Sequence, residues 1–222
     1  MRVSIVIPAL NEAGSLGATL DALPGTAEVI VADGGSSDNT VAMARNRGIR
    51  VLASSRGRGV QMHAGAQAAS GEVLWFLHAD SIPDRTAVEE IVRALGDLTV
   101  VAGNFTLRFS GSSFGARFLN RLYPMLAWIG LRYGDSGIFV RRSVYEECGG
   151  FAAYPIFEDL DLLRRLRRYG RFVTLPGPLT TSSRRFEGRS FFLTFLRWFL
   201  MQLLYWAGVN PCRLGRFYQP IR

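Results

Sequence analysis

The segment WFLHADSIP, Trp75 to Pro83, passes from apolar to polar side chains within a few positions. Its first residues end an apolar run over 73–77, which is typical of a buried strand before a turn. Asp80 then has two interpretations: a metal-binding carboxylate at the end of that strand, or the polar residue that opens a turn. His78 stands two residues earlier, where a second acid would complete a pair of carboxylates.

The sequence upstream of this segment predicts alternating strands and helices. Strands are expected at 3–7, 27–35, 49–54 and 72–80. Helices are expected at 11–23 and 84–95, from N-cap residues 36–40 through Arg47, and within 56–70, where a glycine-containing loop leads into an alanine-rich helix. This alternation predicts parallel βαβ units with helices on both faces of the sheet. The expected fold class is therefore α/β, a Rossmann-like, mostly parallel sheet flanked by helices. The second half is less regular, with strands expected at 100–109 and 133–142 and a helix at 156–170.

Polar side chains follow the predicted strands at the points where they end. In parallel sheets, ligands gather beyond the carboxyl ends of the strands. Each of these residues alone is a common turn or helix-cap residue. Together they predict one shared pocket formed by Asn11, Glu12, Asp33, Arg56, Arg58 and Asp80.

Composition limits the function without choosing it. Of 222 residues, 48% are hydrophobic and 20% charged, which is typical of a folded protein. The 26 Lys+Arg exceed the 18 Asp+Glu, and the net charge of +8 suits nucleic acid, an anionic membrane or a phosphorylated substrate equally. Cys148 and Cys212 belong to no CxxC pair, so we expect neither structural zinc nor a disulfide framework. No secretory signal is apparent, and we expect a cytoplasmic protein.

The segment 190–208, SFFLTFLRWFLMQLLYWAG, predicts an apolar C-terminal helix. Thr194, Arg197, Met201 and Tyr205 fall on one helical face and leave a wide apolar surface elsewhere. Arg197 would cost a few kcal/mol at the centre of a bilayer, which disfavours a transmembrane span. Core packing, a homodimer and peripheral contact with the inner face of the membrane remain open.

Five motifs resemble those of family 2 glycosyltransferases, which have the GT-A fold. They are VSIVIPALNEAGSL, VIVADGGSSDNT, SGEVLWFLHAD, GIFVRRSVYEECGGF and FEDLDLLRRLRRYG, in the family's order between Val3 and Gly170. The length and the later TSSRRFEG look like a small bacterial subgroup found beside radical-SAM proteins and linked to arsenosugar biosynthesis. We expect one domain over 1–222, with a nucleotide-binding half (1–100), an acceptor and catalytic half (101–185) and the apolar helix (190–208).

The resemblance implies a set of donor-binding residues. The aspartate matching Asp33 would hold the imino group of the base, which suits uracil and makes UDP the expected nucleotide, with dTDP as its rival. Arg184 and Arg185 would close over the diphosphate or contact an anionic acceptor, or else form a solvated turn. The implied donor site consists of Pro8, Ala9, Asn11, Glu12, Asp33, Gly34, Arg56, Arg58, His78, Ala79, Asp80, Arg184 and Arg185.

The resemblance also implies a metal ion and a general base. Asp80 matches the last acid of the family's DxD motif and would bind Mg²⁺ or Mn²⁺. His78 would contact the ribose or a carboxylate, or be a direct ligand. Asp159 matches the base of the ED motif, although Asp159 and Glu158 are equally placed as first-turn helix acids. The turn Gly134, Asp135, Ser136 would line the acceptor side.

The predicted function is metal-dependent, inverting sugar transfer from a nucleotide-diphosphate donor to the hydroxyl of a small alcohol or a lipid-linked acceptor. The first alternative is a GT-A protein that binds a nucleotide-sugar without turnover, which the histidine at position 78 keeps open. A nucleotidyltransferase would carry a glycine-rich loop where PALNEAGSL stands, and a dinucleotide oxidoreductase would need GxGxxG after a strand. Nucleic-acid binding would rest on net charge alone, and we do not expect it.

Overall fold

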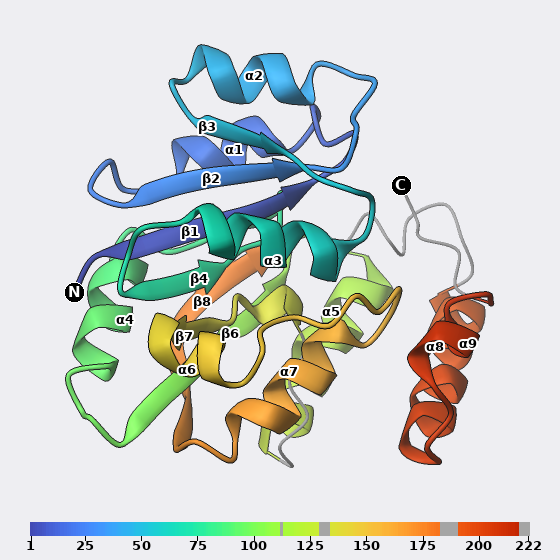
Figure 1. The fold of residues 1–222 in the computed structure, drawn as a ribbon. Helices are drawn as coiled ribbons and strands as arrows, with labels where there is room; N and C mark the ends of the chain where they lie inside the picture. The colour runs from blue at the N-terminus through green and yellow to red at the C-terminus, as the bar shows by residue number, and fades with distance from the viewer. Residues whose placement is uncertain (112, 129–133, 183–190, 218–222) are drawn as a thin grey trace.

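The computed structural model describes residues 1–111, 113–128, 134–182 and 191–217, which form an α/β structure built around one mixed sheet (Figure 1). Its strand order is β3-β2-β1-β4-β7-β6-β8-β5. The strands are β1 (Val3–Ala9), β2 (Glu28–Asp33), β3 (Arg50–Ala53), β4 (Val73–Phe76), β5 (Ser81–Ile82), β6 (Val100–Phe109), β7 (Phe139–Arg141) and β8 (Arg171–Thr181).

The predicted parallel unit is confirmed for the first four strands. β1 pairs in parallel with β2 and β4, and β2 pairs in parallel with β3. β7 runs antiparallel to both β4 and β6. Because Trp75 of β4 pairs with Phe139 at the start of β7, the residues before β7 lie at the carboxyl edge of β4. The chain's second half is therefore joined to the same sheet edge that the sequence selected as a site.

The helices cover both faces of the sheet. They are α1 (Leu16–Asp21), α2 (Thr40–Asn46), α3 (Arg58–Ala68), α4 (Ala87–Ala94), α5 (Phe114–Trp128), α6 (Arg142–Glu147), α7 (Glu158–Leu166), α8 (Phe191–Trp206) and α9 (Pro211–Leu214). One core cluster joins side chains of α1, α2, α4 and α5 to the sheet, and a second joins those of α3, α6 and α7. Burial on both faces is what a continuous apolar strand requires.

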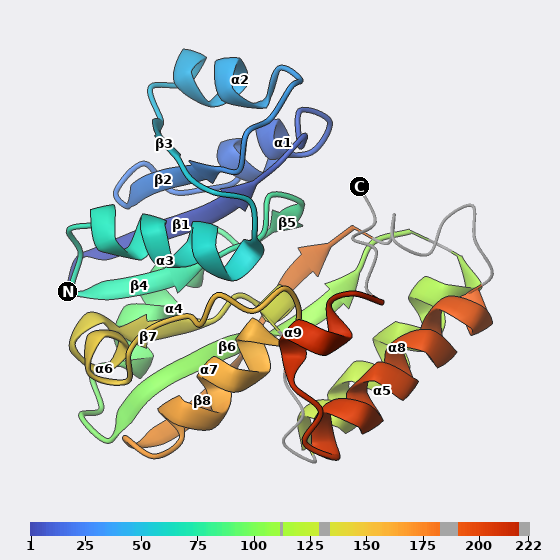
Figure 2. The same cartoon turned by 45° about the vertical axis from the view of Figure 1, so that its right-hand side comes forward.

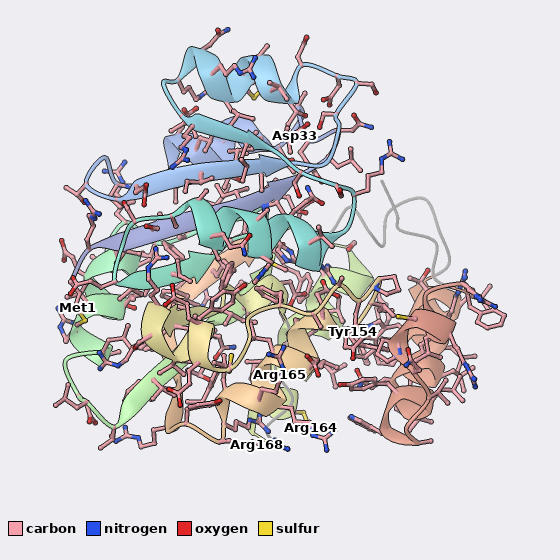
Figure 3. The ribbon with its side chains drawn as sticks, viewed as in Figure 1. Met1, Asp33, Tyr154, Arg164, Arg165 and Arg168 are labelled. Carbon is pink, nitrogen blue, oxygen red and sulfur yellow. The ribbon has the colours of Figure 1, made fainter. Side chains whose placement is uncertain are left out.

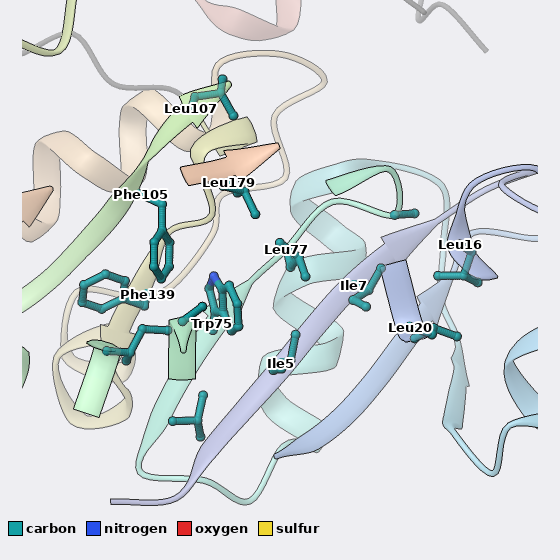
Figure 4. Close-up of a cluster of buried hydrophobic side chains, with 14 of the residues drawn as sticks. Ile5, Ile7, Leu16, Leu20, Trp75, Leu77, Phe105, Leu107, Phe139 and Leu179 are labelled. Atoms are coloured by element: carbon teal, nitrogen blue, oxygen red, sulfur yellow. The ribbon is translucent and has the colours of Figure 1, made fainter. Parts of the chain in front are cut away.

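Alternate residues of the central strands enter the two clusters. Ile5, Ile7 and Trp75 face the first cluster, shown in Figure 4, whereas Val6 and Leu74 face the second. All five are fully buried. Each large apolar side chain removed from water contributes about 1.5–3 kcal/mol, so these strands contribute strongly to the stability of the sheet that carries the site.

The short elements β5, α6 and α9 were not predicted, and neither were two long ones, α5 and β8. α5 contains Pro124, which disfavours a helix interior, and β8 contains Pro176 and Pro178. The register of β8 against β6 shifts between Phe105 and Thr106. Pro176 and Gly177 lie in this irregularity and therefore have no partner in the β6 ladder. The helix predicted at 11–23 also begins later, at Leu16, because Asn11 has a left-handed backbone (φ 55°).

The C-terminal helix is confirmed as α8, Phe191–Trp206. It lies beside α5 at the edge of the molecule rather than on the sheet (Figure 2). Among the described residues, no helix is long and apolar enough to cross a membrane.

Candidate functional site

The loops after β1 and β2 are joined to each other at the carboxyl edge of the sheet. The N–H of Asn11 donates to Ser36 Oγ (2.9 Å), and the Asn11 side-chain oxygen accepts from the N–H of Ser37 (2.9 Å). The N–H of Glu12 donates to Thr40 Oγ1 (2.8 Å). These bonds hold the loop residues Asn11 and Glu12 at the edge beside Asp33.

Asp33 ends β2 with its carboxylate inside its own turn. Oδ2 accepts from the N–H groups of Gly35 (2.9 Å) and Ser36 (3.0 Å), and Oδ1 accepts from Ser36 Oγ (2.5 Å). Asp33 is only 6% exposed. The turn role left open by the sequence is therefore present. A carboxylate has about four acceptor positions, and the turn occupies several of them. The N–H of a nucleotide base would have to use the positions that remain.

Gln61, which the sequence did not single out, connects the ends of the first two strands. Its Nε2 donates to the carbonyl oxygens of Ala9 (2.7 Å) and Ala32 (2.9 Å), and the residue is 4% exposed. A Cβ on Gly34 would lie 3.1 Å from this amide. A glutamine in an alanine-rich helix carries no sequence signal for such a role, because the two carbonyls come from distant strands.

His78, Ala79 and Asp80 form the turn that follows β4. The N–H of Ser81 donates to the His78 carbonyl (3.1 Å), and Thr19 Oγ1 of α1 donates to the Ala79 carbonyl (2.9 Å). Ala79 is buried, whereas His78 and Asp80 are half-buried. The strand therefore ends at Phe76, earlier than predicted, and the turn reading of Asp80 is present. A turn does not exclude metal binding, because the Asp80 side chain is partly accessible.

Arg58 and Glu158 form an ion pair across 100 residues of sequence: Arg58 Nε donates to Glu158 Oε1. The Glu158 side chain is 1% exposed and that of Arg58 is 33% exposed. Gly59 permits this approach, since a Cβ there would lie 2.7 Å from the Ala152 carbonyl oxygen. The pair joins the start of α3 to the start of α7. Arg58 is thus bonded to the acid beside Asp159, a contact that the donor-site prediction did not include.

Asp159 lies against the turn that the sequence placed on the acceptor side. Its Oδ2 accepts from the N–H of Gly134 (2.5 Å), and its Oδ1 accepts from the N–H of Leu160 (2.8 Å). A Cβ on Gly134 would lie 3.0 Å from Asp159 Cβ, so glycine permits the contact. Ser136 is held by the Asn104 amide (2.8 Å), and Asp135 Oδ2 accepts from the Tyr123 hydroxyl (3.3 Å). The predicted acceptor turn and the predicted base therefore meet.

Burial raises the pKa of Asp159 above its usual value, and the neighbouring charge of Glu158 raises it further. The Arg58 guanidinium and the N–H groups of Gly134 and Leu160 act in the opposite direction. The net shift is upward because the residue is only 7% exposed. A carboxylate with a raised pKa accepts protons more readily at neutral pH than a surface aspartate does.

Backbone strain occurs at both ends of this site. Among the described residues other than glycine, only Asn11 (φ 55°) and Phe157 (φ 62°) have positive φ. Phe157 immediately precedes Glu158 and Asp159, and its ring packs on Tyr205 of α8 (4.8 Å between ring centroids). Such conformations cost about 1–3 kcal/mol and cluster at functional sites.

Arg56, among the other predicted residues, is exposed before α3. Pro8 and Ala9 end β1, and the Ala9 carbonyl accepts from Gln61 and from the N–H of Gly34 (2.9 Å). Arg184 and Arg185 lie outside the described residues. A pocket of about 640 Å³ between α7 and the C-terminal helices contains none of the predicted site residues; it is lined in part by Tyr154, Arg164, Tyr205 and Asn210. Figure 3 shows Asp33 and Arg164 in different parts of the molecule.

Comparison with known proteins identifies one family. The model of "Glycosyl transferase family 2" matches residues 4–157. An uncharacterized glycosyltransferase of Mycobacterium tuberculosis is 35% identical over 94 residues, which are 42% of this chain and 43% of the relative. The match thus spans less than half the length of that relative.

Solved glycosyltransferase structures have the same fold. Glucosyl-3-phosphoglycerate synthase from Mycobacterium tuberculosis, in complex with Mn²⁺, UDP-glucose and phosphoglyceric acid, has a TM-score of 0.67 at 23% identity, covering 94% of this chain and 80% of that one. A mannosyltransferase from Pyrobaculum calidifontis, in complex with GDP-Man and Mn²⁺, has a TM-score of 0.71 at 20% identity, covering 94% and 64%. At these identities the likeness concerns the fold.

Proposed function

We propose that this chain, which belongs to glycosyl transferase family 2 and is a glycosyltransferase, moves a sugar from a UDP-sugar to an acceptor hydroxyl with inversion at the anomeric carbon. The observation that carries the proposal is the contact between Asp159, a buried carboxylate with a raised pKa, and the turn Gly134–Ser136 at the carboxyl edge of the sheet. The proposed base and the loops proposed for the donor would thereby share one edge.

The donor would lie over the joined loops after β1 and β2. Asn11, Glu12 and Asp33 come together there, and Gln61 holds the strand ends beneath them. The UDP-glucose bound by the Mycobacterium tuberculosis synthase supports UDP, while the GDP-Man bound by the Pyrobaculum calidifontis enzyme shows that other nucleotides occur on this fold. We retain UDP because a carboxylate at Asp33 would accept the imino N–H of uracil.

The residues present fit a divalent cation that is held jointly with the donor. The described residues include no group of three or more His, Cys, Asp or Glu that could hold a metal alone. Asp80 would therefore be the protein ligand, while the diphosphate and water would supply the remaining oxygens that Mg²⁺ or Mn²⁺ prefers. Mn²⁺ in both solved structures supports this choice. Bound there, the ion would offset the negative charge of the leaving diphosphate.

Asp159 would act as the general base. Its carboxylate would take the proton of the acceptor hydroxyl as that oxygen bonds to the anomeric carbon. The bond from this carbon to the diphosphate breaks at the same time, and UDP leaves with the electron pair. Attack from the face opposite UDP inverts the configuration. Glu158 would not compete for the base role, because its carboxylate is already bonded to Arg58.

Two classes of acceptor agree with features of the chain. A small alcohol would agree with the sequence resemblance to the arsenosugar-linked subgroup, which the similarity to the Mycobacterium tuberculosis glycosyltransferase does not support. A lipid-linked acceptor would agree with the position of α8 beside Phe157. A protein that binds the donor without turnover is the alternative, and loss of sugar transfer in an Asp159 variant separates it from an enzyme.

Donor binding is tested by thermal shift with a panel of nucleotide-sugars in Mn²⁺ or in chelator. At a hundredfold excess over Kd, a ligand stabilises the folded state by about 2.7 kcal/mol, which corresponds to several degrees in a chain of this size. We expect UDP-sugars to give the largest shift with Mn²⁺, and Asp80→Asn to lose the Mn²⁺-dependent part. Asp97→Asn, which changes an exposed acid paired with Arg171, is the matched control and should keep the shift. Absence of stabilisation by every UDP-sugar would remove the donor assignment.

The pH dependence of transfer tests the environment of Asp159. A base works only when deprotonated, so kcat/KM should fall as the pH drops through the raised pKa, above the usual aspartate value of about 3.9. Glu158→Gln removes the charge that raises this pKa, so its acid limb should move to lower pH. A profile that is unchanged in Glu158→Gln would mean that the acid limb reports another group.

A further inference from the structure

The outer surface of α8 has an unusual polarity. Its solvent side carries Leu193, Leu196, Leu200 and Leu204, with Leu193 69% exposed. Its inner side mixes apolar and polar residues: Met201 and Phe195 pack in the core beside Thr194, Gln202 and Tyr205, which are buried or half-buried. Surface helices normally place polar residues toward water. α8 is instead apolar on its outer side as well, and packing within the described residues does not explain those exposed leucines.

A second helix extends this surface. α5 is more than sixty residues earlier in sequence, yet its Phe114 ring lies 6.0 Å from that of Phe192, and its Phe118 ring lies 5.8 Å from that of Phe195. Figure 2 shows the two helices side by side. Phe114, Phe118 and Met125 of α5 are exposed, Met125 by 66%. We call the exposed apolar residues of both helices the α5–α8 face.

Contiguous apolar surface of this kind is rare on a soluble monomer and marks an interaction site. The α5–α8 face also carries cations. On α5, Arg117 and Arg121 are exposed on the same helical side as the apolar residues Phe114, Phe118 and Met125. On α8, Arg197 is exposed among the leucines, and its guanidinium donates to the Phe217 carbonyl. Apolar and cationic side chains therefore alternate on this face.

The charge of the chain is concentrated in the segments that contain these two helices. Residues 110–133 and 188–222 hold eight Arg and no Asp or Glu. Of the chain's 26 Lys+Arg, 18 thus lie elsewhere, where they equal the 18 Asp+Glu. The whole net charge of +8 therefore belongs to these two segments.

We propose that the α5–α8 face binds the surface of an anionic phospholipid bilayer, with its apolar side chains at the acyl boundary and its arginines on lipid phosphates. A second copy of the chain fits less well. In a two-fold dimer this face would meet itself, which would bring like charges together without acids to pair with them. The helices would lie in the interface, in agreement with the lack of a membrane-spanning helix among the described residues. The proposal is independent of the sugar, the nucleotide and the acceptor.

Sedimentation with vesicles tests the proposal. The full chain is mixed with vesicles of phosphatidylcholine alone or of phosphatidylcholine with phosphatidylglycerol. Binding should be at least roughly tenfold stronger to the anionic vesicles and should weaken with added salt. Binding to neither kind of vesicle, or equal binding to both, would overturn the proposal. A dimer in solution that persists in high salt and in the presence of vesicles would also overturn it.

Two variants separate the apolar and cationic contributions. Leu193→Ser with Leu196→Ser should lose roughly tenfold or more in vesicle affinity, whereas Leu98→Ser, at a position 84% exposed in the turn after α4, should bind like wild type. Arg117→Gln with Arg121→Gln should lose most of the preference for anionic vesicles, whereas Arg45→Gln on α2 should keep it. All these positions are exposed, so thermal melting should confirm an unchanged fold. Wild-type binding by both test variants would rule out this face.

Discussion

Asp159→Asn is expected to lower kcat for sugar transfer by about 10²–10⁴-fold while UDP-sugar affinity stays near that of wild type. Asparagine retains the shape of the side chain but cannot take the proton of the acceptor hydroxyl. The loss should appear in kcat because Asp159 lies against the acceptor turn through Gly134, not in the loops where the donor would bind.

The control for this variant lies on the same helix. Asp161 is two residues away and is paired with Arg165 (2.6 Å), outside the predicted site. Asp161→Asn should transfer sugar at nearly the wild-type rate. Melting temperatures of both variants are needed, because an amide in place of the Asp159 carboxylate would lose one of the two N–H contacts. If Asp159→Asn binds donor and transfers sugar as fast as wild type, Asp159 is not the base.

Arg58→Met is expected to lower the free energy of unfolding by about 3 kcal/mol, or roughly 6–12 °C in melting temperature. The variant leaves the carboxylate of Glu158, whose side chain is 1% exposed, without its cation. A buried charge that loses its partner costs more than the pair contributed, because its desolvation is no longer compensated. The lost cation also lowered the pKa of Asp159, so the acid limb of the transfer rate should move to higher pH.

Two further variants make this prediction specific to charge. Glu158→Gln should be less costly than Arg58→Met, because the partly exposed guanidinium can still reach water. The double variant Arg58→Met, Glu158→Leu should recover much of the lost stability, since no buried charge remains. An Arg58→Met melting temperature equal to wild type would contradict a stabilising role for the pair. Simple additivity in the double variant would show that the two side chains act independently.

The sequence predicted the part of the site that is formed by residues directly following strands. Each of β1, β2 and β4 is a short apolar run followed by polar residues, and a strand that ends in a turn determines where its last side chains lie. Asn11, Asp33 and Asp80 were therefore assigned to one sheet edge, and the parallel pairing of β1 with β2 and β4 agrees with that assignment. From the sequence, Asp33 could be a turn residue, a donor-binding residue or both. The bonds that its carboxylate accepts from Gly35 and Ser36 confirm the turn role.

The same local rules failed where prolines were present. α5 and β8 were missed because proline disfavours both helix interiors and strand ladders. In β8 a register irregularity removes the conflict at Pro176, and tertiary packing of Ala116 and Leu119 stabilises α5 despite Pro124.

The sequence by itself determined the alternation of strands and helices, the polar strand ends and the segments in which the positive charge lies, because each depends on neighbouring residues. The tertiary structure alone decided that Arg58 pairs with Glu158, that Gly134 donates to Asp159 and that α5 lies beside α8. These contacts join residues 25 to 100 positions apart, or helices from opposite ends of the second half of the chain. No local periodicity encodes such distances, because they arise only when the sheet brings its two halves to one edge.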